Sequence, residues 1–217
     1  MNKILLFFYF GGAGGKFIAN CLSYSQQVAF AEYQTALKIK QDTDINLLET
    51  ELLKTIPDKN CSKQWLNFEQ GCNQLFGKNI DAIKQGNPVI SNDFYDIGSL
   101  KPLWLPVMAH QKIHYNRLLE WFKNDQVFTV LVDSTPEFID YAIRLKWPEP
   151  HHCLDLNHYK IFQEEIKSLQ FDFEFRNWSP LTTNGQNCII ELAKKININF
   201  DLNLAKNYIN KYVEFHK

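Results

Sequence analysis

The sequence predicts an α/β fold in which a mainly parallel sheet carries helices on both faces. Residues 4–10, ILLFFYF, form a continuous apolar run that ends in glycines, as the buried strands of parallel sheets do. Residues 127–132, VFTVLV, form a second short run that is rich in β-branched side chains. Segments with helical patterns separate the predicted strands, and this alternation is typical of a sheet wound on both faces.

The first half of the chain contains one predicted strand followed by mostly helical segments. A glycine-rich stretch follows residues 4–10, and residues 16–25 then read as a helix. Residues 28–56 and 63–85 also have helical patterns, the first with an apolar stripe of leucines. We interpret the region around 28–85 as a helical insertion that covers the active site.

The second half continues the alternation of strands and helices. Pro106 weakens one of the expected strands, because proline cannot donate to a sheet ladder. Thr135-Pro136 opens one helix, with proline at its first position, and Asp201 is expected to cap the last one. The chain contains no repeat or obvious linker, so residues 1–217 are predicted to form a single domain. The expected strands are 89–90, 103–109 and 171–175, and the expected helices are 113–123, 135–145, 158–169, 184–196 and 201–215.

Composition narrows the class of protein. The 217 residues are 45% hydrophobic and 22% charged, which is enough to bury a core without disulfides or metals. The formal net charge is −1 and no lysine- or arginine-rich run occurs, so neither nucleic acid nor an anionic membrane is expected as a partner. The tryptophans lack the interleaved basic residues of a nucleic-acid surface.

Cysteine usage and the N-terminal residues bear on location. The five cysteines are widely and irregularly spaced without a C-x-x-C pair, which indicates reduced thiols in a reducing compartment. Lys3 and the apolar run after it resemble a short signal peptide, but Lys16 interrupts the apolar stretch. No run approaches the length of a membrane span. We therefore expect a cytoplasmic protein.

The glycine-rich stretch between the first strand and helix predicts an anion-binding loop, or P-loop. Glycines allow backbone N–H groups to converge on an anion, the helix N-terminus adds a partial positive charge, and Lys16 supplies a full one. The alternative is a glycine-rich turn that only packs against the sheet. The predicted ligand-binding residues of the loop are Gly11, Gly12, Ala13, Gly14, Gly15, Lys16 and Phe17.

The loop departs from the nucleotide-triphosphate motif GxxxxGK[ST] at two places. Phe10 stands where that motif has its first glycine, and Phe17 stands where it has a hydroxyl residue. That hydroxyl ligates Mg²⁺ in nucleotide triphosphatases, so Phe17 argues against ordinary Mg–ATP chemistry.

Three stretches resemble the sulfotransferase family. AGGKFI at 13–18 is similar to its phosphosulfate loop, which follows a buried first strand. PVMAHQKIHYNRLLEWF resembles the third strand, the catalytic histidine and the next helix, and VFTVLVDSTPEFIDYAIRLKW resembles the fourth strand and the helix after it. The resemblance implies 3′-phosphoadenosine 5′-phosphosulfate as cofactor, which needs no Mg²⁺ ligand from the loop. It also implies His110 or His114 as catalytic base, with Lys16 holding the transferred group.

The resemblance weakens where the family binds the cofactor's 3′-phosphate with an arginine and a serine. Asp133 or Ser134 and then the segment 140–142 occupy the corresponding places, and an aspartate would repel a phosphate. Ser134 remains a candidate ligand, and Arg144, one turn further on, is a candidate substitute for the missing arginine.

Other side chains suggest a substrate site and different activities. Asp93 and Asp96 follow the strand expected at 89–90, where they can orient a substrate, act as base in a kinase-like enzyme, or cap a turn. The set His151, His152, Cys153 and His158 has no second ligand cluster, so we expect a solvated loop and no metal site.

Three hypotheses about function follow from these residues. The first is a sulfotransferase-like enzyme that modifies a hydroxyl of a small molecule, sugar or peptide. The second is an atypical P-loop kinase that uses ATP with Mg²⁺. The third is a non-catalytic binding protein with a P-loop fold.

Overall fold

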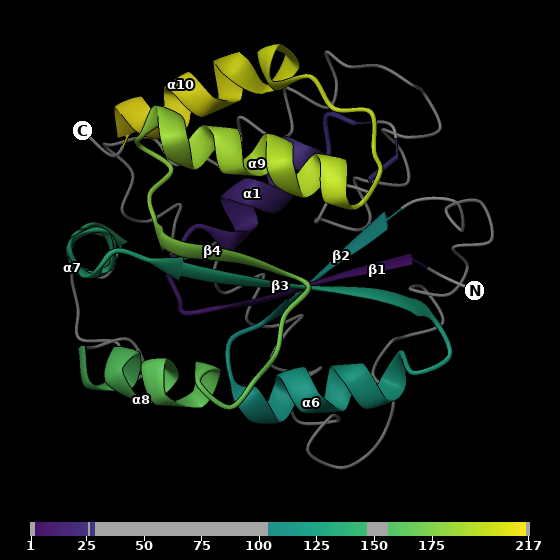
Figure 1. Ribbon diagram of the computed structural model, residues 1–217. Coiled ribbons are helices and arrows are strands. Elements are labelled where there is room, and N and C mark those ends of the chain that lie inside the picture. The colour runs from purple at the N-terminus through teal and green to yellow at the C-terminus, as the bar shows by residue number, and fades with distance from the viewer. Residues whose placement is uncertain (1–2, 26, 29–103, 147–155, 216–217) are drawn as a thin grey trace.

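The structure is a computed structural model, and it describes residues 3–25, 27–28, 104–146 and 156–215 (Figure 1). Within these ranges the predicted α/β fold is confirmed, because the strands form one parallel sheet with helices on both faces. Several predictions lie outside them: the helical insertion around 28–85, the strand at 89–90 with Asp93 and Asp96, and the loop that contains His151, His152 and Cys153.

The sheet has four parallel strands in the order β2-β1-β3-β4. Within β1, Leu6 pairs with Val107 on one side and with Thr129 on the other. Helices cover both faces of this inner strand, which is why it reads as a continuous apolar run: residues 4–8 are each at most 1% exposed. The strands are β1 (Lys3–Tyr9), β2 (Trp104–Ala109), β3 (Gln126–Ser134) and β4 (Phe173–Trp178).

The helices form two layers around the sheet (Figure 1). One layer contains α1 (Gly15–Leu22), α9 (Thr183–Lys195) and α10 (Lys206–Phe215), and the other contains α6 (Lys112–Trp121) and α8 (Leu156–Ile166). The helix α7 (Pro136–Lys146) lies beyond the end of β3.

Aromatic side chains join these layers to the sheet. Phe8 packs against Tyr115 of α6 and Phe162 of α8, with ring centroids 5.1 Å and 5.2 Å away. On the opposite face, Phe17 of α1 packs against Tyr212 of α10 at 4.2 Å. Both helical layers therefore contribute to the core that surrounds β1.

Proline in β2 is tolerated because of where that strand lies. Pro106 pairs with Leu5 of β1, and β2 is the outermost strand of the described sheet on that side. One side of such a strand faces away from the rest of the described sheet. A proline that lacks an N–H on that side removes no hydrogen bond of the described sheet.

Two C-terminal elements begin later than predicted. The strand expected at 171–175 begins at Phe173, because the residue before it, Asp172, binds β3 through its side chain. The Asp172 carboxylate accepts hydrogen bonds from the backbone N–H and the hydroxyl of Thr129, at 2.7 Å and 2.8 Å. Asp201 does act as a cap, but of the 3₁₀ turn Leu202–Ala205, and α10 begins only at Lys206.

Buried tyrosines predict a loss of stability at alkaline pH. Burial raises the pKa of Tyr115 to about 12, an effect to which the Asp172 carboxylate adds, and burial also raises the pKa of Tyr159 and Tyr212. Above the ordinary tyrosine pKa of about 10, the unfolded chain loses these protons while the folded chain keeps them, so the free energy of unfolding falls as pH rises. Each tyrosine contributes a slope of about 1.4 kcal/mol per pH unit.

Urea unfolding between about pH 8 and about pH 11.5 measures this slope, while tyrosinate absorbance of the folded protein reports the titration itself. An unfolding free energy that stays constant above about pH 10 would contradict the burial of these hydroxyl groups.

Candidate functional site

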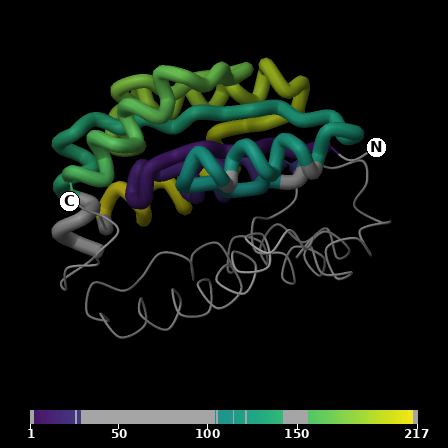
Figure 2. The backbone as a smooth tube through the Cα atoms, turned by 90° about the horizontal axis from the view of Figure 1, so that it is seen from below, coloured from purple at the N-terminus to yellow at the C-terminus, as the bar shows by residue number. Residues whose placement is uncertain are grey.

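The candidate site lies at the carboxyl ends of β1 and β3. The chain leaves β1 through α1 on one face of the sheet and leaves β3 through α7 toward α8 on the other face. In Figure 2 the purple N-terminal segment lies between teal segments, as expected for β1 between β2 and β3. Ligands of open parallel sheets bind where connections diverge in this way, since a crevice forms outside the strand ends.

The glycine loop joins β1 to α1 through two left-handed backbone positions. The N–H of Ala13 donates to the carbonyl oxygen of Phe10 at 2.9 Å, which closes a turn. Gly12 has φ 87° and Gly14 has φ 86°, a conformation that glycine adopts at little cost. Gly14 is also the N-cap of α1, and it has no side-chain oxygen to accept from the first-turn N–H groups. This arrangement is typical of helix N-termini that bind anions.

Part of the loop is packed tightly, and part of it is accessible. A Cβ atom at Gly14 would lie 2.6 Å from Cζ3 of Trp178, and a Cβ at Gly15 would overlap the ring of Tyr9. Gly11, Gly12 and Lys16 are partly exposed, whereas residues 13–15 are buried. The packed-turn interpretation therefore accounts for the absence of a side chain at Gly14 and Gly15, and Gly11, Gly12 and Lys16 are the more accessible residues of the loop.

The side chain of Phe17 belongs to the core. It is 2% exposed, and its ring centroid lies 5.7 Å from that of Tyr208 and 6.2 Å from that of Trp178. Phe17 is one of the predicted ligand-binding residues of the loop, but in this structure it can offer a ligand only its backbone.

Ser134 is occupied in holding the loop. Its side chain is 1% exposed, and its Oγ donates to the carbonyl oxygen of Ala13 at 2.7 Å. The structure thus brings Ser134 to the glycine loop, where its hydroxyl faces the loop backbone.

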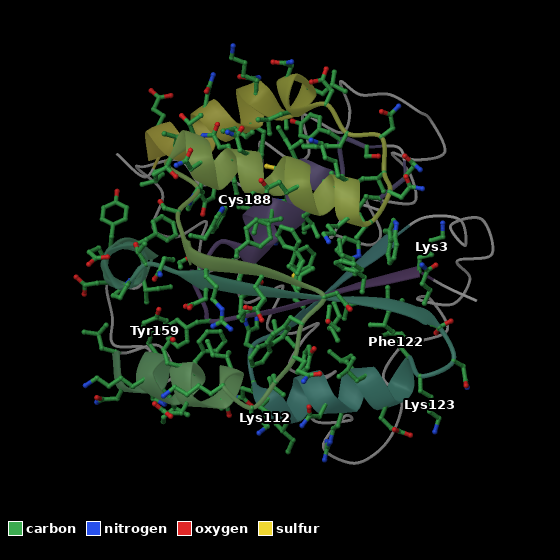
Figure 3. All side chains as sticks on the ribbon, viewed as in Figure 1. Lys3, Lys112, Phe122, Lys123, Tyr159 and Cys188 are labelled. Atoms are coloured by element: carbon green, nitrogen blue, oxygen red, sulfur yellow. The ribbon has the colours of Figure 1, made fainter. Side chains whose placement is uncertain are left out.

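Asp133 lies in a buried polar network between β3, α8 and β4. Its Oδ1 accepts from the hydroxyl of Tyr159 at 3.0 Å and from Nε2 of Gln163 at 2.7 Å, and Nη1 of Arg176 lies 3.8 Å from its Oδ2. Figure 3 shows Tyr159 on α8, on the side of that helix toward the sheet. Burial and then the Asp133 carboxylate raise the pKa of Tyr159, so its hydroxyl stays protonated and remains a donor at neutral pH.

His110 follows the end of β2 directly, which confirms the expectation that it stands at a strand end. The imidazole is exposed, its Nδ1 lies 3.1 Å from the carbonyl oxygen of Tyr9, and its ring packs edge-on against the Tyr9 ring at 4.4 Å. A carbonyl oxygen can only accept, so the partner assigns the proton to Nδ1. In the neutral ring Nε2 then carries the lone pair and can act as a base.

For two other predicted site residues, His114 and Arg144, the structure gives only the helix on which each lies. His114 lies in the first turn of α6 and Arg144 lies in α7, and their side chains are outside the description.

Sequence reasoning missed Tyr159 and Gln163. Their signal is a spacing of four residues, which places both on one face of α8 together with buried Phe162 and Ile166.

Together, the fold and the site define an α/β protein whose glycine-rich strand-to-helix loop lies at the switch point of a parallel sheet. No family model, no curated protein and no solved structure matches the chain. Among the residues that the structure describes, no group of three or more His, Cys, Asp or Glu side chains is arranged to hold a metal ion. In the same ranges, every helix is too short or too polar to cross a bilayer.

Proposed function

We propose that this protein is a sulfotransferase-like enzyme that transfers a sulfuryl group to a hydroxyl of a small molecule, sugar or peptide. One observation supports this most: the glycine loop with Lys16 follows the end of β1, while His110, whose Nδ1 lies 3.1 Å from the carbonyl oxygen of Tyr9, follows the end of the neighbouring β2. An anion cradle and a base on adjacent parallel strands are the two parts that transfer to a hydroxyl requires.

Each residue has a definite role in this proposal. The cofactor 3′-phosphoadenosine 5′-phosphosulfate supplies the sulfuryl group. Nε2 of His110 accepts the proton of the acceptor hydroxyl as its oxygen bonds to sulfur. Lys16 and the loop amides balance the charge on the terminal oxygens and on the phosphate oxygen that keeps the electron pair of the broken S–O bond.

The fit to this cofactor differs between its two ends. The glycine loop suits the 5′-phosphosulfate group, because it combines left-handed glycines, a helix N-terminus and a lysine. At the place expected for the 3′-phosphate, the hydroxyl of Ser134 is engaged and Asp133 is a buried carboxylate. Arg176, whose side chain is 44% exposed, is the cation beside Asp133. We therefore expect the 5′ end to dominate affinity.

Asp133 gives a specific reason to keep the kinase alternative. ATP has no 3′-phosphate for that carboxylate to repel. The buried ring of Phe17 counts against ATP with Mg²⁺, since it removes the hydroxyl that ordinarily ligates the metal. Ligand binding decides between the two.

The deciding experiment compares thermal unfolding with 3′-phosphoadenosine 5′-phosphate, with ATP and Mg²⁺, and without ligand. A ligand at about a hundred times its Kd stabilises the folded state by about 2.7 kcal/mol. We expect stabilisation by 3′-phosphoadenosine 5′-phosphate. Stabilisation by ATP with Mg²⁺ alone would favour the kinase, and no response to either would favour a non-catalytic protein.

Lys16→Ala is expected to weaken binding of the stabilising nucleotide by about 10- to 100-fold, because a charge-assisted hydrogen bond contributes about 1.5 to 3 kcal/mol. Isothermal titration calorimetry measures the change. Lys123→Ala is the matched control: Lys123 lies just beyond α6, at the opposite edge of the sheet from the strand ends (Figure 3), and its exposed pair with Glu120 contributes little. Equal affinity of the Lys16 variant and wild type would exclude Lys16 from the site.

A further inference from the structure

A continuous chain of buried hydrogen bonds connects α8 to the glycine loop. The hydroxyl of Tyr159 donates to the carbonyl oxygen of Ser134 at 2.9 Å, and Oγ of Ser134 donates to the carbonyl oxygen of Ala13 at 2.7 Å. Tyr159 is 8% exposed, Ser134 is 1% exposed and Ala13 is fully buried. The chain thus joins a helix on one face of the sheet to the loop that begins α1 on the other face.

The loop needs an anchor because its sequence provides little rigidity. Ala13 stands between Gly12 and Gly14, both in the left-handed region, and glycine loses more conformational entropy on folding than any other residue. The N–H of Ala13 is held by Phe10, and its carbonyl group is held by Ser134. Both backbone polar groups of the central residue are therefore fixed by partners outside the two glycines.

Fixing the Ala13 carbonyl also sets the direction of the next N–H group. The carbonyl of Ala13 and the N–H of Gly14 belong to one trans peptide plane, in which they point in opposite directions. When Oγ of Ser134 holds the carbonyl, the Gly14 N–H must point away from Ser134. The hydrogen bond thereby selects one orientation of a loop amide.

The outer end of the chain is itself held in place. The single hydroxyl proton of Tyr159 is shared between the carbonyl oxygen of Ser134 and Oδ1 of Asp133, which lies 3.0 Å away, and Gln163 donates to the same carboxylate oxygen at 2.7 Å. The ring of Tyr159 packs edge-on against Phe10, the first residue of the turn, at 5.3 Å. Asp133 thus serves as an acceptor that orients Tyr159, which gives this carboxylate a role beside a loop expected to bind anions.

We propose that Tyr159 and Ser134 are positioning residues that hold the Ala13–Gly14 peptide of the glycine loop in its ligand-binding orientation. This inference rests on the proposed function in so far as the loop binds the anionic group of a nucleotide. Neither side chain touches the ligand; both act through the backbone of Ala13.

Ser134→Ala and Tyr159→Phe each remove one hydroxyl from this chain, and Ser134→Thr keeps one. The matched control is Tyr115→Phe: Tyr115 is also a buried tyrosine, on a helix of the same layer as α8, and its hydroxyl lies 3.4 Å from the carbonyl of Gln170. The first measurement is amide hydrogen exchange of residues 11–16 in ligand-free protein, and the second is the Kd for 3′-phosphoadenosine 5′-phosphate and for ATP with Mg²⁺.

We expect exchange in residues 11–16 to accelerate about five- to tenfold in Ser134→Ala and Tyr159→Phe, which is the effect of one lost hydrogen bond. Affinity for the nucleotide that binds wild type should fall by about the same factor. Ser134→Thr should restore both values toward wild type, and Tyr115→Phe should change neither, even where it lowers the melting temperature.

Unchanged exchange in both hydroxyl-removing variants would overturn the proposal, whether or not a nucleotide binds. If wild type binds neither nucleotide while loop exchange still accelerates in the variants, the hydrogen-bond anchor is supported and the proposed function fails. If Ser134→Ala does not fold, Tyr159→Phe decides the question, because it keeps the ring and removes a single oxygen atom.

Discussion

Replacing Gly14 by alanine is expected to lower the free energy of unfolding by about 3 kcal/mol. The left-handed backbone at this position costs an alanine about 1 to 2 kcal/mol. The added Cβ would also lie 2.6 Å from Cζ3 of Trp178, and forcing an extra carbon into a packed site costs about 1 to 3 kcal/mol. Trp178 cannot easily yield, since its Nε1 donates to the carbonyl of Gly185 at 2.8 Å and its ring packs against Phe175.

Urea unfolding of Gly14→Ala beside Gly11→Ala separates these causes from a general effect of alanine in the loop. Gly11 is partly exposed, and the positive-φ glycines of the described ranges are Gly12 and Gly14, so we expect Gly11→Ala to cost less than about 1 kcal/mol. If Gly14→Ala stays within about 1 kcal/mol of wild type, the close approach of Trp178 to the loop is wrong.

The elements that sequence reasoning predicted well are those with strong local patterns. The apolar run of β1 and the β-branched run of β3 appear within one or two residues of their expected bounds, and the helix after the glycines begins within one residue of its expected start but ends three residues earlier than expected. The start of β4 was misplaced because a long-range pairing decides it: Asp172 is held by Thr129, 43 residues earlier. Local periodicity carries no information about such a partner.

The candidate site divides in the same way. The glycine loop and His110 do follow the strands expected at 4–10 and 103–109, because their positions depend only on where a strand stops. The directions of Phe17 and Ser134 were not predictable, since they depend on which distant segments cover them. Phe17 is covered by two tyrosines of α10 near the C-terminal end of the chain, and Ser134 faces a carbonyl 121 residues earlier.

Asp133 shows how a local interpretation can change once its neighbours are known. Taken alone, a carboxylate beside an anion-binding loop is unfavourable, because it repels phosphate. In the structure it accepts hydrogen bonds from Tyr159 and Gln163 and is 7% exposed. The residue thus fits as part of the support of the loop, and the repulsion becomes a question for the cofactor's 3′-phosphate alone.

His110→Gln is expected to lower kcat by about 100-fold or more with little change in KM, because general base catalysis contributes about 10²- to 10⁴-fold to a proton transfer. Glutamine can still donate from its amide to the Tyr9 carbonyl, which the Nδ1 of His110 now approaches at 3.1 Å, but it has no basic nitrogen. The assay is release of 3′-phosphoadenosine 5′-phosphate from the phosphosulfate in the presence of phenol, sugar and tyrosyl-peptide acceptors.

His114→Gln is the informative comparison for this prediction, since the sequence alone allowed either histidine to be the base. His110 follows the last residue of β2, and its Nδ1 lies 3.1 Å from the carbonyl oxygen of Tyr9, the last residue of β1, whereas His114 is the third residue of α6. A base must come within hydrogen-bonding reach of the acceptor hydroxyl while the loop holds the other reactant, and the contact with Tyr9 holds His110 beside the residue after which the glycine loop begins. We therefore expect His114→Gln to keep nearly full activity. A large loss of activity in His114→Gln with none in His110→Gln would assign the base to α6. Wild-type activity in both variants would exclude both histidines as the base.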